Sequence, residues 1–298
     1  MAKAIVPATT ANLGPGFDAL GLALNLYNIF TLEETGSGLE VNVLPEGEVR
    51  LPLNERNLAY RAAKRLLDEV GYTSLGLKLT IENDVPMGRG LGSSSTAIVG
   101  GLAAANVLAG ARLTKDEIFA LASEIEGHPD NVGPAIYGGF TICYPTQSGF
   151  KAVSYKPSDS LTPVILIPNS TLETKKARGV LPTEVSMTDA VFNIARSSLL
   201  ASVILEGRAD LLHDAMVDRL HQPYRAPLIP GLLDVIREVQ SVPNVGIALS
   251  GAGPSLICIV EKTNQSRFSE LVEGIIKEKQ WDYTVKPAEF DLVGVTAS

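Results

Sequence analysis

The sequence has little cysteine, little histidine and no long uninterrupted apolar segment. Its two cysteines, Cys143 and Cys258, each stand inside an apolar strand-like stretch, so we expect buried free thiols rather than a disulfide or a metal site. None of the three histidines begins a His-Glu-x-x-His zinc motif, and no apolar run reaches the roughly 18–20 residues that span a bilayer.

Clusters of basic residues are also missing. Lys and Arg are scattered along a chain whose net charge is −8, which argues against a nucleic-acid or anionic-membrane surface. The first residues, Met1–Pro7, show no basic start followed by a long apolar stretch, so we expect no signal peptide and a cytoplasmic protein. With 298 residues, of which 45% are hydrophobic and 19% charged, the chain can bury a sizeable core.

The apolar pattern predicts both strands and helices. Period-two alternation indicates half-buried strands at 39–43 and 77–81, and a short apolar run between two prolines indicates a covered strand at 164–167. Helical spacing and capping residues indicate helices at 59–70, 97–109, 114–126 and 186–203. The apolar face predicted for the last helix consists of Val191, Phe192, Ala195, Leu199 and Val203.

The order of these elements favours an α+β fold. Strands and helices mix without the strict β-α-β-α alternation of a doubly wound sheet, and no internal repeat is present. The stretch 145–163 is rich in Ser, Pro and Gly and its apolar pattern is broken, which is typical of a domain boundary. We therefore predict two domains, residues 1–155 and residues 156–298.

The most informative segment is Pro86–Thr96, which reads Pro-Met-Gly-Arg-Gly-Leu-Gly-Ser-Ser-Ser-Thr between a predicted strand and a predicted helix. Its alternating glycines permit positive φ and let the backbone approach a ligand without interference from a Cβ. Consecutive serines at a helix start leave N–H groups free at the positive end of the helix dipole. The segment therefore predicts a site for an anion such as a triphosphate, with a serine hydroxyl as a natural Mg²⁺ ligand.

Other phosphate-binding motifs fit this segment poorly. The chain has no Gly-Lys dipeptide, so it has no Walker A loop, and the spacing of Gly88, Gly90 and Gly92 differs from the dinucleotide fingerprint. Two further glycine-rich segments, Pro7–Gly21 and Leu249–Ser255, are weak signals when taken alone, because a surface connection or a tight strand connection would explain them.

Taken together and in this order, the three segments resemble the three signature motifs of the GHMP kinase superfamily (galactokinase, homoserine kinase, mevalonate kinase and phosphomevalonate kinase). The resemblance extends from Pro7 to Ser255. It implies an α+β fold in which an N-terminal domain like the second domain of ribosomal protein S5 precedes a ferredoxin-like C-terminal domain. It also implies ATP as co-substrate, Mg²⁺, a small-molecule acceptor between the domains, and a homodimer.

The resemblance assigns the nucleotide to the middle segment and the metal to Ser94 and Glu126, with Glu124 as the alternative acidic ligand. A family-based expectation adds Asn57, before the first helix, as an adenine contact. The ATP-binding residues that it implies are Asn57, Pro86, Met87, Gly88, Arg89, Gly90, Leu91, Gly92, Ser93, Ser94, Ser95 and Thr96.

Within the superfamily, three charged residues point to an amino-acid acceptor. The local patterns around Asp18, Arg178 and Arg225 resemble those of the members that phosphorylate L-homoserine on the way to threonine. A carboxylate suits the ammonium group of that substrate, and an arginine fork suits its carboxylate. The acceptor residues that the resemblance implies are Asn12, Asp18, His128, Asn131, Thr174, Arg178 and Arg225.

Two positions depart from the mevalonate kinase-like pattern. Thr9 stands where those members have a lysine, and Asn131 stands where they have an aspartate as base. Both differences argue against mevalonate as acceptor. We expect Asn131 to orient the acceptor hydroxyl, with Asp130 as the alternative catalytic group. A sibling kinase for a sugar, mevalonate or shikimate, and a ligand sensor without catalysis, remain as the alternative functions.

Overall fold

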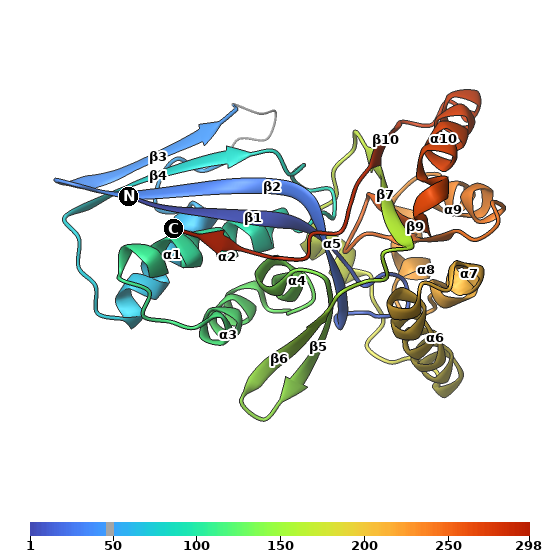
Figure 1. Cartoon of the computed structure of the whole chain (residues 1–298), viewed down its shortest axis with the longest axis horizontal. Helices are drawn as coiled ribbons and strands as arrows, with labels where there is room; N and C mark the ends of the chain where they lie inside the picture. The colour runs from blue at the N-terminus through green and yellow to red at the C-terminus, as the bar shows by residue number, and fades with distance from the viewer. Residues whose placement is uncertain (46–50) are drawn as a thin grey trace.

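Two β-sheets organise the chain in the computed structural model, which describes residues 1–45 and 51–298 (Figure 1). The strands of the first sheet are β1 (Ala2–Ala11), β2 (Leu20–Thr35), β3 (Gly38–Leu44), β4 (Gly76–Asn83), β5 (Phe140–Thr146), β6 (Gly149–Tyr155) and β11 (Thr296–Ala297). Those of the second sheet are β7 (Leu161–Pro168), β8 (Gly246–Leu249), β9 (Leu256–Glu261) and β10 (Tyr283–Pro287).

The large sheet has the order β11-β1-β2-β4-β3, and the hairpin β5–β6 joins it through β2. The small sheet has the order β10-β7-β9-β8. Pairing is antiparallel within both sheets in the described residues, except that β3 and β4 run parallel. Antiparallel sheets with helices gathered on one face are typical of an α+β fold, as the order of elements predicted.

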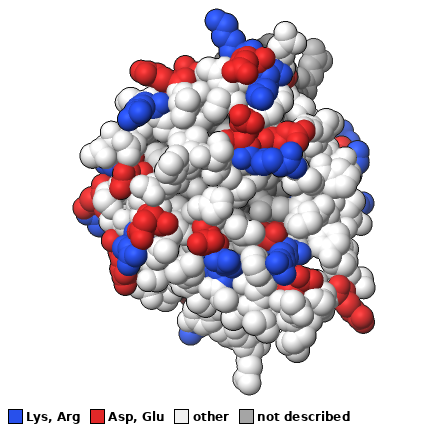
Figure 2. All heavy atoms as spheres, turned by 90° about the vertical axis from the view of Figure 1, so that its right-hand side faces the viewer, with Lys and Arg blue, Asp and Glu red and all other residues white. Residues whose placement is uncertain are grey.

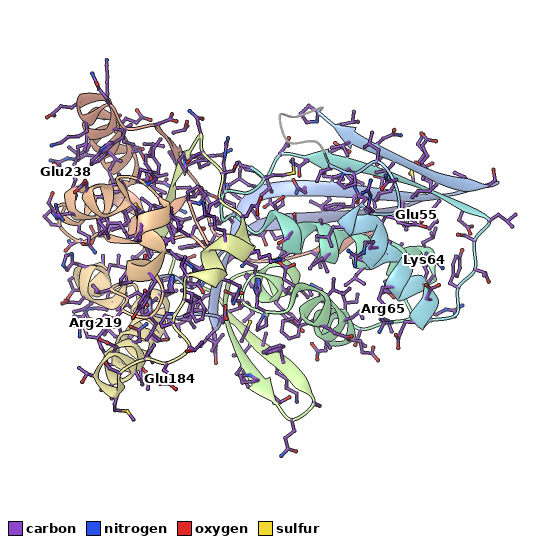
Figure 3. The ribbon with its side chains drawn as sticks, turned by 180° about the vertical axis from the view of Figure 1, so that it is seen from behind. Glu55, Lys64, Arg65, Glu184, Arg219 and Glu238 are labelled. Atoms are coloured by element: carbon purple, nitrogen blue, oxygen red, sulfur yellow. The ribbon has the colours of Figure 1, made fainter. Side chains whose placement is uncertain are left out.

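Helices α1 to α4 lie along one face of the large sheet, and α6 to α10 surround the small sheet (Figure 1). Charged side chains such as Lys64 on α1 and Glu238 on α9 point outward (Figure 3). The helices are α1 (Leu58–Glu69), α2 (Ser93–Leu108), α3 (Lys115–Glu126), α4 (Val132–Tyr137), α5 (Thr174–Gly179), α6 (Met187–Glu206), α7 (Leu212–Ala215), α8 (Gln222–Arg225), α9 (Leu232–Gln240) and α10 (Gln265–Lys279).

Helix α2 packs between the large sheet and helix α1, and this close packing explains its small residues. A Cβ added at Gly100 would come within 2.0 Å of the Phe30 ring, and one added at Gly101 within 2.1 Å of the Ala59 carbonyl oxygen. Glycine inside a helix is destabilising by about 0.5–1 kcal/mol relative to alanine, so its presence here marks contacts that no larger residue allows. The tight packing fixes the middle of α2 against the large sheet and against α1.

The small sheet is buried on both faces, which explains the unbroken apolar run of β7. Ile165 and Ile257 belong to a core cluster that also contains Leu200 of α6. Val164 and Leu256 face the other way, into a cluster with α9 and α10. The first of these clusters also contains side chains of β2 and β5, so it joins the two sheets and holds the loops between them in place.

Most predicted elements are confirmed. The strands at 39–43, 77–81 and 164–167 lie inside β3, β4 and β7, and the predicted helices correspond to α1, α2, α3 and α6. Thr114 forms a capping box with Glu117 at the start of α3, and Ser186 accepts a hydrogen bond from the N–H of Asp189 at the start of α6. These caps were readable because each depends on two residues three positions apart.

The predicted apolar face of α6 is wrong in part. Val191 is 56% exposed, whereas Leu200, Val203 and Ile204 are buried. Toward its start the helix instead buries Asn193, whose side chain is hydrogen-bonded to Asp218 at 2.7 Å. Among the described residues, α6 is also the helix that is long and apolar enough to cross a membrane by length and composition, a property that core helices of soluble proteins share.

The stretch 145–163 contains strand β6, which its composition did not indicate. Side chains of β6 are half-buried or exposed on both faces, so no apolar alternation appears in the sequence. The two sheets divide the chain between Tyr155 and Leu161, except that β11 returns to pair with β1 and brings Ser298 beside Lys3. The division into domains at residues 155 and 156 stays a prediction; we propose it with this C-terminal return as part of the first unit.

Candidate active site

The three glycine-rich segments meet at one place between the sheets. The N–H of Thr9 donates to the carbonyl of Leu91 at 3.2 Å, which joins the first segment to the middle one. The N–H of Gly251 donates to the carbonyl of Ala11 at 3.1 Å, and the Ser250 hydroxyl donates to the carbonyl of Gly90 at 2.6 Å. Segments that are weak signals alone therefore form a single hydrogen-bonded unit.

The glycines of the middle segment are required by these contacts. Gly88, Gly90 and Gly92 have φ values of 65°, 77° and 70°, in the left-handed region that favours glycine. A Cβ at Gly90 would lie 2.2 Å from the Ser250 carbonyl oxygen, and one at Gly92 would lie 2.0 Å from the Thr9 hydroxyl. The predicted positive φ is confirmed. The glycines also let the other two glycine-rich segments approach the backbone of the middle segment closely.

The start of α2 presents free backbone donors. Gly92 is the N-cap, and it offers no side chain to accept from the first N–H groups. The Ser94 and Ser95 hydroxyls both donate to Oε1 of Glu126, at 2.5 and 2.8 Å. This geometry brings together the two predicted metal ligands, Ser94 and Glu126, whereas Glu124 lies on a different hollow of the surface.

A cavity of about 220 Å³ opens beside the start of α2. Six of the seven predicted acceptor residues line it, and the seventh, Asp18, lies at its edge in contact with Arg178. The lining residues are Asn12, Gly88, Gly90, Leu91, Gly92, Ser93, Ser94, Glu126, His128, Asp130, Asn131, Leu172, Glu173, Thr174, Arg178, Arg225, Gly251 and Ala252.

Some predicted nucleotide residues have structural contacts instead of a place on the cavity. Asn57 caps α1 by accepting from the N–H groups of Ala59 and Tyr60, and it is buried. Thr96 is buried, and Arg89 donates to the carbonyl of Asn169 at 3.1 Å. The nucleotide contacts of these three, and of Pro86, Met87 and Ser95, stay predictions that rest on the resemblance.

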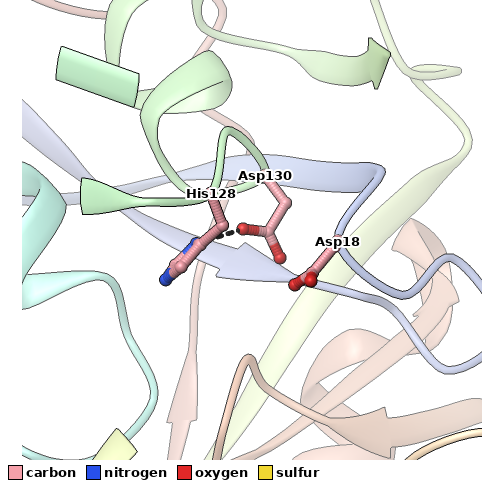
Figure 4. Close-up of side chains that lie close together, drawn as sticks. All are labelled: Asp18, His128 and Asp130. Carbon is pink, nitrogen blue, oxygen red and sulfur yellow. Dashed lines mark hydrogen bonds and ion pairs between the residues drawn. The ribbon is translucent and has the colours of Figure 1, made fainter. Parts of the chain in front are cut away.

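An acidic corner forms on one side of the cavity (Figure 4). Asp130 is buried, and its Oδ1 accepts from Nδ1 of His128 at 2.7 Å and from the N–H of Asn131 at 3.1 Å. Asp18 approaches from the loop after β1, so that ligand atoms of Asp18, His128 and Asp130 lie within 4.8 Å of one another. Burial alone would lower the pKa of His128, but its hydrogen bond to Asp130 and the neighbouring carboxylates raise it.

Asp18 also forms a two-bond ion pair with Arg178 of α5, with N–O distances of 2.7 and 3.0 Å. These hydrogen bonds raise the pKa of Arg178. Asp18 has a φ of 54°, and Asn12 and Leu13 in the same loop also have positive φ. Each such residue costs on the order of 1 kcal/mol or more, and strained backbone of this kind clusters at functional sites.

Arg225 is the least exposed charge at the site, with 1% of its surface accessible. Among the described residues no carboxylate lies within 4.0 Å of its guanidinium, which is held instead by the carbonyls of Ala177 and Gly251 and by His221. Burial and the charge of Arg178 lower the pKa of Arg225 to about 10. A buried guanidinium with neutral partners on one side of a cavity is a receptor for an anion.

Thr9 fixes the amide of Asn131. The Thr9 hydroxyl donates to Oδ1 of Asn131 at 2.8 Å, and both residues are buried. Nδ2 of Asn131 has no partner among the described residues, which leaves the donor end of the amide for a ligand. The sequence identified Thr9 only as the residue that stands in place of a lysine. It gave no sign of a role for Phe17 or His221 beyond their nearness in the chain to Asp18 and Arg225.

The chain belongs to the GHMP kinase family. The family's N-terminal domain model matches residues 57–139, and its C-terminal domain model matches residues 200–272. A homoserine kinase of Clostridium botulinum is 39% identical over 298 residues, which is 100% of this chain and 99% of that protein. A homoserine kinase of Clostridium beijerinckii is 40% identical over 292 residues, 98% of this chain and 96% of that protein.

Solved structures agree with this assignment. A homoserine kinase from Cytophaga hutchinsonii superimposes with a TM-score of 0.87 at 26% identity, covering 100% of this chain and 97% of that one. A mevalonate kinase structure matches with a TM-score of 0.70 at 16% identity, covering 97% and 99%, which shows a shared fold. The predicted α+β GHMP kinase fold is confirmed.

Proposed function

We propose that this chain transfers the γ-phosphoryl group of ATP to the side-chain hydroxyl of L-homoserine, giving O-phospho-L-homoserine for threonine biosynthesis. The full-length relatives named above are homoserine kinases. The observation that carries the proposal is the buried guanidinium of Arg225, which lines the same cavity as the serine-rich start of α2. A neutral sugar would give this charge no partner.

The ion pair between Asp18 and Arg178 suits a zwitterionic acceptor. In this structure the two side chains neutralise each other. An amino acid can enter by exchange of partners, with its ammonium group on Asp18 and its carboxylate on Arg178 and Arg225. This exchange leaves neither Asp18 nor Arg178 without an opposite charge, and it brings an anion to Arg225, which has no carboxylate partner of its own in the described part of the chain.

The nucleotide half of the cavity depends on the backbone. The free N–H groups at the start of α2, with the helix dipole behind them, are suited to the phosphates of ATP. Glu126 with the Ser94 hydroxyl is an all-oxygen donor set of the kind that Mg²⁺ prefers, so these residues would hold the ion. When bound, Mg²⁺ neutralises charge on the phosphate oxygens.

Catalysis then consists of alignment and charge stabilisation. The homoserine hydroxyl oxygen forms the new bond to the γ-phosphorus, the bond to the bridging oxygen breaks, and ADP leaves. Nδ2 of Asn131, held by Thr9, donates a hydrogen bond to the reacting oxygens, and the hydroxyl proton leaves late, to phosphate or water.

Asp130 is the alternative acceptor for that proton, because its Oδ2 has no hydrogen-bond partner among the described residues. The variant Asp130→Asn separates the two schemes. Without a base, turnover at saturating homoserine is retained within about tenfold, since general-base catalysis contributes about 10²–10⁴-fold. Abolished turnover with retained homoserine binding would establish Asp130 as the base.

The remaining predictions concern partners. Lys and Arg are mixed with Asp and Glu on the face shown in Figure 2, which has no basic patch. Action on free small molecules, without a nucleic-acid or membrane partner, stays a prediction from the sequence. The homodimer, which rests on the resemblance, and the cytoplasmic location, which rests on the sequence pattern, are further predictions.

The test is ADP release from MgATP with L-homoserine, compared with mevalonate, galactose, shikimate and L-serine. Selective turnover of L-homoserine is the expected result. Preference for another acceptor would keep the kinase and overturn the proposed substrate. ATP binding without turnover of any acceptor would favour a ligand sensor.

A further inference from the structure

The guanidinium of Arg225 has only part of its hydrogen-bonding capacity satisfied by the protein. Nε donates to the carbonyl of Ala177 at 3.2 Å, and Nη1 donates both to the carbonyl of Gly251 and to Nδ1 of His221, each at 3.0 Å. A guanidinium has five N–H donors, so these bonds use three and leave the two on Nη2. Because Arg225 lines the cavity, Nη2 is the part of the side chain left for an acceptor.

His221 supplies the one side-chain acceptor in this set. It is completely buried, and its Nε2 lies 2.8 Å from the carbonyl oxygen of Gly14. A carbonyl can only accept, so Nε2 carries the proton, and Nδ1 presents a lone pair to Arg225. Burial lowers the pKa of His221, which keeps the ring neutral. An imidazolium would turn an N–H toward the guanidinium and remove the acceptor.

Hydrogen bonds to Asp218 hold the backbone around His221 in place. Asp218 accepts from the N–H groups of Leu220, His221 and Gln222 at 3.0, 3.0 and 2.7 Å, and it is the nearest carboxylate to the ring, at 3.6 Å from Nε2. Asn193 of α6 fixes Asp218 in turn, at 2.7 Å. The imidazole therefore has little freedom to leave Arg225.

Phe17 closes the same arrangement from the first glycine-rich segment. Its ring centroid is 5.3 Å from that of His221 and 5.5 Å from the central carbon of Arg225. The central carbon of the Arg178 guanidinium lies 5.8 Å from the centroid of the same ring. The aromatic ring thus contacts both arginines, and its electron-rich face stabilises two cations that would otherwise repel each other.

We propose that His221 is a positioning residue for acceptor specificity: its neutral imidazole holds Arg225 so that Nη2 meets the carboxylate of the amino-acid substrate. This inference rests on the proposed function and deepens it. His221 itself does not line the cavity, so it acts through Arg225. Without the Nδ1 acceptor, the guanidinium would have a buried N–H unpaired and would turn to satisfy it.

The test uses two acceptors, L-homoserine and 3-amino-1-propanol, which is the same molecule without its carboxylate. In His221→Phe, which keeps a ring but removes the acceptor, kcat/KM for L-homoserine falls about 10- to 100-fold, mainly through KM. The value for 3-amino-1-propanol and the KM for ATP stay within about threefold, since neither depends on Arg225. His221→Asn places an amide oxygen near Nδ1, so it restores most of the preference although it loses the bond to Gly14.

Equal losses on both acceptors would show that His221 is merely structural and would overturn the inference. A wild-type enzyme that phosphorylates some acceptor but shows no preference for L-homoserine would overturn the proposed function instead. If His221→Phe does not fold, ¹⁵N NMR of the wild-type imidazole decides. An unprotonated Nδ1 and a protonated Nε2 from pH 6 to pH 8 are expected, and a protonated Nδ1 would overturn the inference.

Discussion

The two halves of the cavity are built from different parts of the polypeptide. The half that we propose for the nucleotide consists mainly of backbone and small side chains from one continuous segment, which leads into α2. The half that we propose for the acceptor has charged side chains from four separate places: Asp130, Arg178 and Arg225, which line the cavity, and Asp18, which pairs with Arg178. Backbone donors suit phosphates, which all nucleotides share, whereas side chains from several elements can be exchanged to change the acceptor.

This comparison predicts that replacing a glycine by alanine is tolerated less well in the nucleotide half than in the acceptor half. In Gly92→Ala, the new Cβ meets the Thr9 hydroxyl at 2.0 Å, and φ at this residue is +70°. We expect activity to fall by about 100-fold or more, together with a loss of roughly 2–4 kcal/mol in the free energy of unfolding. Steady-state kinetics and urea denaturation measure the two effects.

Gly110 provides the matched control, because it has a φ of +87° with nothing within 4 Å of an added Cβ. Gly110→Ala should lose about 1 kcal/mol of stability from backbone strain and keep its activity. Equal activity losses in the two variants would mean that strain, rather than contact between the glycine-rich segments, limits the site.

In the acceptor half, removing a charge should change substrate choice more than fold. Arg225→Met is expected to lower kcat/KM for L-homoserine by about 100-fold, because the substrate carboxylate loses its buried partner. The KM for ATP should change little. Arg237→Met, on the exposed surface of α9, is the control. An unchanged kcat/KM for L-homoserine in Arg225→Met would contradict the assignment of this residue to the acceptor.

Thr9 connects the two halves, and its effect should fall on turnover. Thr9→Val keeps the shape but frees the Asn131 amide to rotate, so we expect kcat to fall by about tenfold with KM for both substrates nearly unchanged. Thr9→Ser retains the hydroxyl and should restore most of the rate. A serine variant as slow as the valine variant would assign the loss to packing.

The smallest expected effect is on stability and comes from His128. Its pKa is raised in the folded protein, so its bond to Asp130 contributes fully below the unfolded pKa of about 6.5 and is lost as pH rises through the folded value. His128→Gln should therefore destabilise the protein more at pH 6 than at pH 9, by urea denaturation. A penalty that does not depend on pH would mean that His128 is not charged when it binds Asp130.

The sequence predicted the nucleotide half better than the acceptor half for a physical reason. A strand, a glycine-rich turn and a capped helix are local features, so Pro86–Thr96 could be interpreted from its own residues. Arg178 and Arg225 could be assigned only through resemblance, because nothing local distinguishes them from solvated surface charges. The partners of Arg225, above all His221, depend on contacts across as many as 207 positions of the chain, as between His221 and Gly14.

The same distinction applies to the fold. Elements with regular patterns, such as β4 and α1, were predicted because one face of each is buried. Strand β6 and the exposed apolar side of α6 were not, since both lie where the chain packs on one side only or not at all. The apolar pattern of a sequence indicates which side chains are buried, so it does not predict an element whose side chains are exposed.

The most direct test of the account is the structure of the protein with L-homoserine and a non-hydrolysable ATP analogue. The account predicts the substrate carboxylate within hydrogen-bonding distance of Nη2 of Arg225, its ammonium group on Asp18, and the phosphates at the start of α2. An acceptor bound elsewhere, with the pair between Asp18 and Arg178 intact and Arg225 untouched, would contradict it.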